Sequence, residues 1–388
     1  MSVLVTRMPS SLLIQLLIII AFTLNYPAIY IAVFALVLAR SIYYLYYSGI
    51  VQSENILYFF GLFICVYFGL VFNLIEYPTI IIHSLIAVIT FTAAILYVKD
   101  LLIYKKISKY LLIIFQVIIL IVVARIGFNN FPAENPLEEL IEGSSSNAIP
   151  TITIVLQINY FIAKYFAKKG VPIITSIITL IIAIIGYGRG SIISAFFILV
   201  LALICTIKIK NVKQFFFFSL PVLALLVILI YSYYDEISTF IYLNTKLSAG
   251  LVDYHRERIF SAYFSQLDVY TLIAGADYPD FVKYDYNSNP HNSFIRAHHF
   301  FGIFYVLFIL VIPIVTLWKL SKLKDKTIVF FLLVVLFFRC FSEPVLFPTI
   351  FDFYFFASFY VVPKLYLNSI SSFQVNAQLS NQTQVNGK

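Results

Sequence analysis

The stretch "HNSFIRAHHFFGIFYVLFILVIPIVTLWK", residues 291–319, decides the fold class of this chain. Its first part holds three of the five histidines, together with Asn292 and Arg296, and an apolar run follows directly. An apolar run of about 20 residues is long enough to cross the ~30 Å of a bilayer's hydrocarbon as a helix. We therefore predict a membrane-spanning helix whose polar beginning lies at one membrane surface.

The composition extends this prediction to the whole chain. Hydrophobic residues make up 62% of the 388 residues and charged residues 11%, far from the roughly half apolar and one-quarter charged usage of soluble domains. The apolar runs are uninterrupted, whereas the strands of a membrane β-barrel alternate. We predict an all-α, polytopic protein with one integral membrane domain over 1–388. The twelve predicted spans are about 9–25, 27–46, 55–73, 78–98, 110–127, 149–167, 171–187, 190–207, 215–233, 299–318, 327–342 and 347–367.

Lysine residues indicate how the spans are oriented, because lysine collects in loops that stay in the cytoplasm. Four loops that join an even-numbered span to an odd-numbered one carry them: Lys99, Lys105, Lys106 and Lys109; Lys164, Lys168 and Lys169; Lys208, Lys210 and Lys213; Lys319, Lys322, Lys324 and Lys326. This parity places both termini in the cytoplasm, with 369–388 as a disordered tail. The net charge of +8 is mostly this topology signal, so we expect no nucleic-acid partner.

The opposite face carries two long polar segments, 128–148 and 234–298. The second is unusually long, and loops beyond ~12–15 residues are mostly functional or disordered. We predict a large, partly helical periplasmic loop. The apolar spacing within 249–270 indicates an amphipathic helix that turns Arg256 inward and leaves Arg258 more exposed.

Arginine has the opposite distribution to lysine. Six of the eight arginines map to the outer loop or to outer helix ends: Arg125, Arg189, Arg256, Arg258, Arg296 and Arg339. A guanidinium binds phosphate and carboxylate oxygens with two parallel hydrogen bonds and stays charged when partly buried. We predict an outer-face site for an anionic group, most plausibly the phosphates of a lipid carrier. The alternative is that these arginines pair with Glu76, Glu343 or Asp352, or snorkel to lipid headgroups.

Four short motifs within 188–302 resemble the bacterial O-antigen polymerase and O-antigen ligase superfamily, over about a third of the chain. They are "GRGSIIS" at 188–194, "RERIF" at 256–260, "IAGAD" at 273–277 and "HNSFIRAHHFFG" at 291–302. The chain departs from the family pattern at Gly188, Phe260, Asp277 and Tyr305, where that family more often has serine, tryptophan, glycine and glycine.

This resemblance implies a GT-C-like glycosyltransferase of the bacterial inner membrane with its active face in the periplasm. Such an enzyme moves a glycan from undecaprenyl pyrophosphate to the sugar hydroxyl of a new lipid-linked repeat unit. Its expected partners are that lipid-linked oligosaccharide, membrane lipid and a chain-length-regulating membrane protein. A closely related alternative is an O-antigen ligase that transfers polymer to lipid A core. An alternative from another functional class is a lipid-linked oligosaccharide flippase.

The residues suit a metal-independent reaction, since the sequence contains no D-x-D pair and its histidines lack zinc-ligand spacing. We expect no cofactor and no metal. The predicted catalytic residues are Arg189 and Arg256, which would bind the diphosphate, and His291, which would accept the proton of the acceptor hydroxyl. The predicted substrate-binding residues are Asn292, Arg296, Arg258, Arg339 and Gly302. We interpret His298 and His299 as packing residues at a helix mouth, and His83 as a core histidine.

Overall fold

The computed structural model describes residues 8–24, 27–48, 53–73, 77–127, 135–138, 147–206, 232 and 254–371. All regular elements in these ranges are helices. Five of the helices are long and apolar enough to cross a membrane: Glu54–Phe72, Pro78–Tyr97, Leu101–Ile126, Arg189–Thr206 and Ser293–Lys319. Several predicted segments lie outside the described residues: nearly all of the span 215–233, most of the first outer loop, the second outer loop up to residue 253, and the tail from 372.

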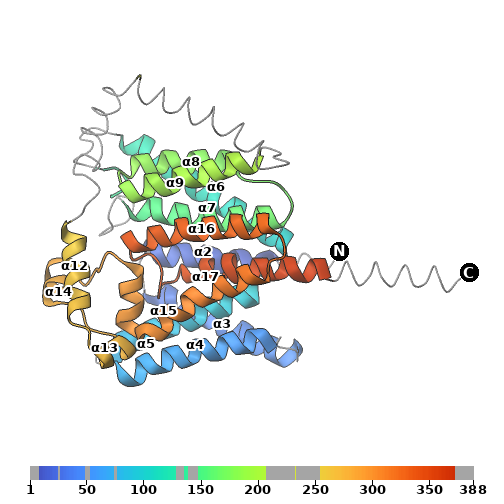
Figure 1. Cartoon of the computed structure of the whole chain (residues 1–388). Coiled ribbons are helices and arrows are strands. Elements are labelled where there is room, and N and C mark those ends of the chain that lie inside the picture. Colours follow the sequence, from blue (N-terminus) through green and yellow to red (C-terminus); the bar gives the residue numbers. More distant parts are fainter. Residues whose placement is uncertain are drawn as a thin grey trace, which may run out of the picture.

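The long helices lie side by side, and three short helices cover one end of the bundle (Figure 1). The long helices of the first half are α2 (Met8–Leu24), α3 (Pro27–Ser48), α4 (Ser53–Phe72), α5 (Tyr77–Tyr97), α6 (Leu101–Ile126), α7 (Ala148–Phe166), α8 (Ile173–Ile185) and α9 (Arg189–Thr206). The covering helices are α12 (Tyr254–Ser265), α13 (Val269–Ala274) and α14 (Asp280–Asp285). The chain then forms α15 (Ser293–Lys319), α16 (Leu323–Ser342), α17 (Asp352–Phe356) and the π-helix η2 (Ala357–Val361), and it stays helical over 362–371.

The bundle is apolar on its outside and hydrogen-bonded within. On α4, Leu57 and Phe60 expose more than half of their surface. Inside, Gln116 donates to Thr179 Oγ1 over 2.9 Å, and Gln157 Nε2 donates to Ser176 Oγ over 2.8 Å. Polar side chains that pair between helices beneath an apolar exterior are typical of a membrane-embedded bundle, where water cannot satisfy them.

Single helices separate lysine from arginine. Lysines lie near the start of α6 and at the end of α15, whereas Arg125 ends α6 and Arg296 lies in the first turn of α15. On α16, Lys324 and Lys326 lie near the start, while Arg339 is in the last turn. Contacts described below bring Arg296, Arg339 and the start of α9 to the end that α12–α14 cover, so the arginines gather there.

Two predicted boundaries are wrong. The fifth span was expected to begin near residue 110, after a lysine-bearing loop, but α6 begins at Leu101 and includes Lys105, Lys106 and Lys109. Asp100 starts the helix early because its carboxylate accepts from the backbone N–H groups of Leu102 and Ile103. Likewise α15 begins at Ser293 and not near residue 299, so Arg296 and His298 are on the helix and not in the loop before it.

A backbone break at Gly302 interrupts α15. Gly302 has φ 66°, and a Cβ there would lie 1.8 Å from the carbonyl oxygen of Ile273, so the backbone of α13 packs directly against it. Asn73, just after α4, holds this crossing together by donating to the carbonyls of Ala274, His299 and Phe300. The amide of Asn73 thereby satisfies carbonyls that the break leaves free.

The covering helices have a small apolar core of their own. Ile259 and Tyr263 of α12 are buried with Tyr278, Val282 and Ile295. Phe260 and Phe264, which the apolar spacing places on the same face, stay 46% and 47% exposed. The difference arises because α12 contacts its neighbours along one narrow stripe, in which Ile259 and Tyr263 stand four residues apart.

Candidate functional site

Two arginines from distant segments share one carboxylate at the covered end of the bundle. Arg256 Nη2 of α12 lies 3.6 Å from Glu343 Oε1, and Arg339 Nη2 of α16 lies 3.5 Å from the same oxygen. Arg339 is 1% exposed and also donates to the hydroxyls of Ser342 and Thr151. A buried guanidinium needs such partners, because an unpaired buried charge is costly.

The start of α9 packs against this pair. A Cβ on Gly190 would lie 3.0 Å from Arg339 Nη1 and 3.2 Å from Ser342 Oγ, so only a residue without a side chain fits there comfortably. A Cβ on Gly188 would lie 1.6 Å from Asn147 Oδ1. The glycines on either side of Arg189 therefore let the first turn of α9 approach Arg339. We call Arg189, Arg256, Arg339 and Glu343 the arginine cluster.

Several buried polar atoms around the arginine cluster have no hydrogen-bond partner among the described residues. They are Arg189 Nη1, Arg339 Nε, Ser191 Oγ and Asn147 Oδ1. Arg256 and Arg339 share the carboxylate of Glu343, and the N-terminus of α9, where Arg189 stands, adds its own positive end. Unpartnered donors beside a helix N-terminus, together with neighbouring guanidinium groups, are suited to binding an anion.

The beginning of α15 is tied to the segment that carries Glu343. Ser293 Oγ donates to the carbonyl of Glu343 over 2.7 Å, and Asn292 Nδ2 donates to the carbonyl of Phe341 over 3.3 Å. The Asn292 side-chain oxygen accepts from the backbone N–H groups of Phe294 and Ile295. Both ends of the Asn292 side chain are therefore engaged, and in the structure it acts as a helix cap, while its predicted role in substrate binding stays a prediction.

His291 directly precedes that cap. It has φ 50°, its backbone N–H donates to Asn289 Oδ1 over 2.9 Å, and its ring meets the ring of Tyr286 edge-on at 5.9 Å. The positive φ fixes the turn that leads into α15. The structure thus brings His291 to the helix start that Ser293 links to Glu343.

Two other predicted substrate contacts lie elsewhere. The Arg258 guanidinium stacks 4.4 Å from the ring centre of Phe281, within the covering helices. Gly302 meets the backbone of α13, so protein backbone packs against this glycine. Its predicted role in substrate binding stays a prediction.

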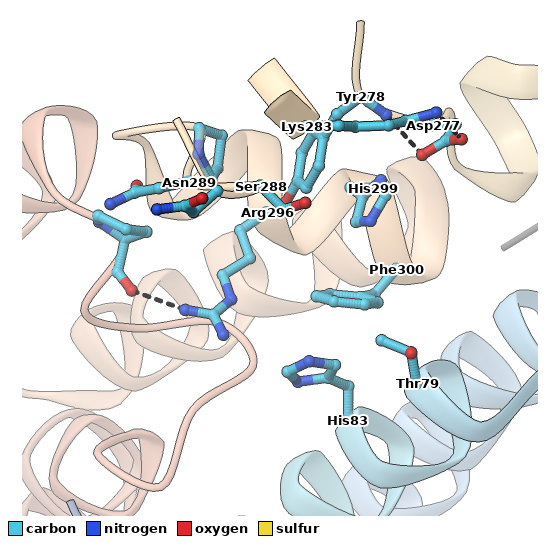
Figure 2. Close-up of a pocket in the computed structure, with 13 residues that line it drawn as sticks. Thr79, His83, Asp277, Tyr278, Lys283, Ser288, Asn289, Arg296, His299 and Phe300 are labelled. Atoms are coloured by element: carbon cyan, nitrogen blue, oxygen red, sulfur yellow. Dashed lines mark hydrogen bonds and ion pairs between the residues drawn. The ribbon is translucent and has the colours of Figure 1, made fainter. Parts of the chain in front are cut away.

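Arg296 faces a separate pocket of about 660 Å³, shown in Figure 2. Thr79 and His83 of α5 line it from one side, Tyr278 and Lys283 from another, and 287–290 border it. Pro344 also lines it and accepts a hydrogen bond of 3.0 Å from Arg296 Nη1. We call this space the basic pocket.

Aromatic rings shape the basic pocket. The His299 ring stacks on Tyr278 with 3.7 Å between ring centres and 13° between planes, while the His83 ring lies 3.8 Å from that of Phe300. His299 Nδ1 is hydrogen-bonded to the carbonyl of Ala276. His83 Nδ1 is buried and has no hydrogen-bond partner among the described residues. Figure 2 shows His83 below the Phe300 ring and the side chain of Arg296 beside it.

The two cations of the basic pocket differ in how they are compensated. Lys283 Nζ lies 2.6 Å from Asp277 and 3.6 Å from Asp280, and the hydrogen bond to Asp277 raises the pKa of Lys283 above its usual value. Within the described part of the chain, Arg296 forms no ion pair. Arg296 is therefore the cation of the pocket that no carboxylate approaches within ion-pair distance among the described residues, with Asp352 farther away but within its electrostatic reach.

Sequence reasoning missed most of this pocket. It placed Arg296 at the site but assigned His83 to the core and His299 to packing, and it singled out neither Tyr278 nor Lys283. The available signal was Thr79 and His83, two polar residues four apart on one face of an apolar span. Nothing in the sequence indicated that α5 meets the segment 277–290.

No three His, Cys, Asp or Glu side chains lie close enough to hold a metal ion in the ranges that the structure describes. No protein-family profile, curated protein or solved structure matches this chain.

Proposed function

We propose that this protein is an O-antigen polymerase: a membrane glycosyltransferase with a GT-C-like arrangement that uses a polyprenyl-diphosphate-linked donor. It would transfer a growing glycan to a sugar hydroxyl of a fresh lipid-linked repeat unit at the periplasmic face of the inner membrane. The proposal combines the four sequence motifs with the position of their residues at one end of an apolar helical bundle.

The observation that carries the proposal is the arginine cluster. Its arginines come from three separate elements, α9, α12 and α16, and Glu343 pairs with two of them, Arg256 and Arg339. The buried atoms Arg189 Nη1 and Arg339 Nε have no hydrogen-bond partner among the described residues. A diphosphate carries more than one negative charge and several acceptor oxygens, so it complements such a cluster well.

The reaction needs little else from the protein. The oxygen of the acceptor hydroxyl bonds to the anomeric carbon, the bond from that carbon to the diphosphate oxygen breaks, and the electron pair leaves with the diphosphate. Arg189, Arg256 and Arg339 stabilise the developing charge, which is commonly the largest catalytic contribution. His291 takes the hydroxyl proton, since histidine is the side chain whose ordinary pKa lies nearest neutrality.

Complementation tests the proposal in cells that make lipopolysaccharide with a single repeat unit because they lack their polymerase. The wild-type chain should restore the ladder of long polymer on a gel. Arg189→Ala, Arg256→Ala and His291→Ala should each abolish the ladder while the protein still inserts in the membrane. Arg40→Ala is the matched control, because Arg40 stacks on Tyr43 and Tyr97 of α3 and α5, outside the arginine cluster.

Other results would point to the other functions. A ligase would leave the ladder absent in the polymerase-deficient cells. In ligase-deficient cells, which accumulate polymer on the lipid carrier, it would restore the transfer of that polymer to lipid A core. Rescue of repeat-unit export without any glycosyl transfer would identify a flippase. A full ladder from all three variants would contradict the assigned site.

A further inference from the structure

We infer that the basic pocket binds the acceptor glycan through an acidic sugar, meaning one that carries a carboxylate. This inference deepens the proposed function and rests on it, because it assigns the second substrate of the same reaction to a site beside the arginine cluster. None of Arg189, Arg256 and Arg339 lines the basic pocket, so the two sites are distinct.

The lining of the basic pocket suits a saccharide. Tyr278 and Phe300 add apolar wall to the pocket, each with a histidine ring close to it, and Asn287, Ser288 and Asn289 supply amide and hydroxyl groups at the border. His83 also lines the pocket, and its buried Nδ1 has no hydrogen-bond partner among the described residues. Most of the lining residues are polar, which suits the many hydroxyl groups of a saccharide. A volume of about 660 Å³ accommodates a short oligosaccharide.

The charge of the basic pocket fits a single carboxylate. Asp277 and Asp280 hold Lys283, which leaves Arg296 as the cation without an ion pair among the described residues. One Arg296 Nη1 hydrogen bond goes to Pro344, and the remaining guanidinium donors stay available. A diphosphate would bring at least two negative charges to this one cation, whereas the arginine cluster brings several guanidinium groups together. The two sites are therefore matched to different anions.

The geometry also couples the two sites. Glu343 pairs with Arg256 and Arg339, and the carbonyl of the next residue, Pro344, accepts from Arg296. A glycan in the basic pocket would thus lie one peptide unit from the residue that organises the diphosphate site. This is the relation that an acceptor and a leaving group require.

The test is ligand-observed NMR on the full-length protein in lipid nanodiscs. The probes are a disaccharide with a terminal glucuronic acid, the matching disaccharide with a terminal glucose, and inorganic phosphate as competitor. We expect the glucuronide to bind at least about tenfold more tightly than the glucose compound, as a charged hydrogen bond to arginine would give. Arg296→Gln should remove that difference, and Arg40→Gln should keep it.

A gain-of-binding variant guards against a folding defect in Arg296→Gln. Asp277→Asn releases Lys283 from its closest carboxylate, so it should tighten glucuronide binding by a few fold, which an unfolded protein cannot do. Equal binding of both disaccharides, no binding of either, or an unchanged difference in Arg296→Gln would overturn the inference. Displacement of the glucuronide by inorganic phosphate at equal concentration would instead assign the pocket to a phosphate group.

The same samples separate this inference from the proposed function. Binding of farnesyl diphosphate should persist in Arg296→Gln, because the arginine cluster is intact. If farnesyl diphosphate fails to bind the wild-type protein while the glucuronide binds through Arg296, the proposed function fails and the pocket keeps its ligand class. If only the diphosphate binds, the acceptor assignment fails alone.

Discussion

Arg339 and Glu343 form an ion pair of 3.5 Å one helical turn apart, where α16 ends, and Arg256 reaches the same carboxylate oxygen from α12. Arg339 and Glu343 are 1% and 8% exposed. A buried carboxylate that holds two guanidinium groups fixes them in position before any ligand arrives. The arrangement therefore lowers the cost of ordering arginine side chains around an anion.

Replacing the shared acid should make the protein depend on an anion for its stability. Glu343→Gln leaves Arg339 buried without its carboxylate, and breaking a buried pair in this way costs about 3–5 kcal/mol. Inorganic pyrophosphate should raise the melting temperature of Glu343→Gln more than that of the wild type. The melting temperature is measured as the temperature at which monodisperse protein is lost. An equal rise in the melting temperature of both proteins on adding pyrophosphate would exclude an anion at the arginine cluster.

Asn292 should be replaceable by another good helix cap. Asn292→Ser keeps a side-chain oxygen for the N–H groups of Phe294 and Ile295, whereas Asn292→Ala loses it at about 1 kcal/mol. We expect Asn292→Ser to retain polymer and stability and Asn292→Ala to lose stability. Loss of polymer in Asn292→Ser at wild-type stability would instead show that the amide contacts substrate.

Gly302→Ala should loosen the crossing of α13 and α15. The new methyl group would overlap the Ile273 carbonyl at 1.8 Å, so α13 has to move away. Gly170→Ala is the matched control: Gly170 has φ 78°, close to the 66° of Gly302, but no atom lies within 4 Å of a Cβ there. Gly170→Ala should lower the free energy of unfolding only by the conformational strain of about 1–3 kcal/mol. Limited proteolysis should cut the covering helices faster in Gly302→Ala alone, and equal protection of both variants would contradict the packing role.

At Gly188, the residue more common in the superfamily that the motifs resemble does not fit the space in this structure. The resembling family more often has serine there, but a Cβ would lie 1.6 Å from Asn147 Oδ1. We expect Gly188→Ser to impair polymer formation by displacing the start of α9, and Asn147→Gly in the same chain to restore it. Polymer length on a gel reports both effects. Full activity of Gly188→Ser by itself would show that Asn147 moves without consequence.

Patterns within one segment predicted much of this molecule. The apolar runs indicated a helical membrane protein, and the spacing around Arg256 turned that residue inward, where it meets Glu343. The sequence named Glu76, Glu343 and Asp352 as possible partners of the arginines without choosing among them. Asp352 accepts from the backbone N–H groups of Phe347 and Thr349 and is within electrostatic reach of Arg296. Such choices depend on contacts between distant segments, which periodicity does not encode.

The basic pocket was beyond prediction for the same reason. Its residues come from α5, from 277–290, from α15 and from Pro344, segments that include pairs more than two hundred positions apart in the sequence. Boundaries also mattered: Asn292 caps α15 early and thereby carries Arg296 and His299 onto one helix beside the pocket. A hydropathy window centred on the apolar run places that boundary several residues later.

The most direct test of the central claim is the affinity of the purified protein in nanodiscs for farnesyl diphosphate, compared with farnesyl monophosphate. The arginine cluster predicts that the wild type prefers the diphosphate and that Arg189→Gln, Arg256→Gln and Arg339→Gln each weaken its binding at least about tenfold. Arg40→Gln should bind it like the wild type. Equal affinity for both lipids, unchanged by the three cluster variants, would contradict the account.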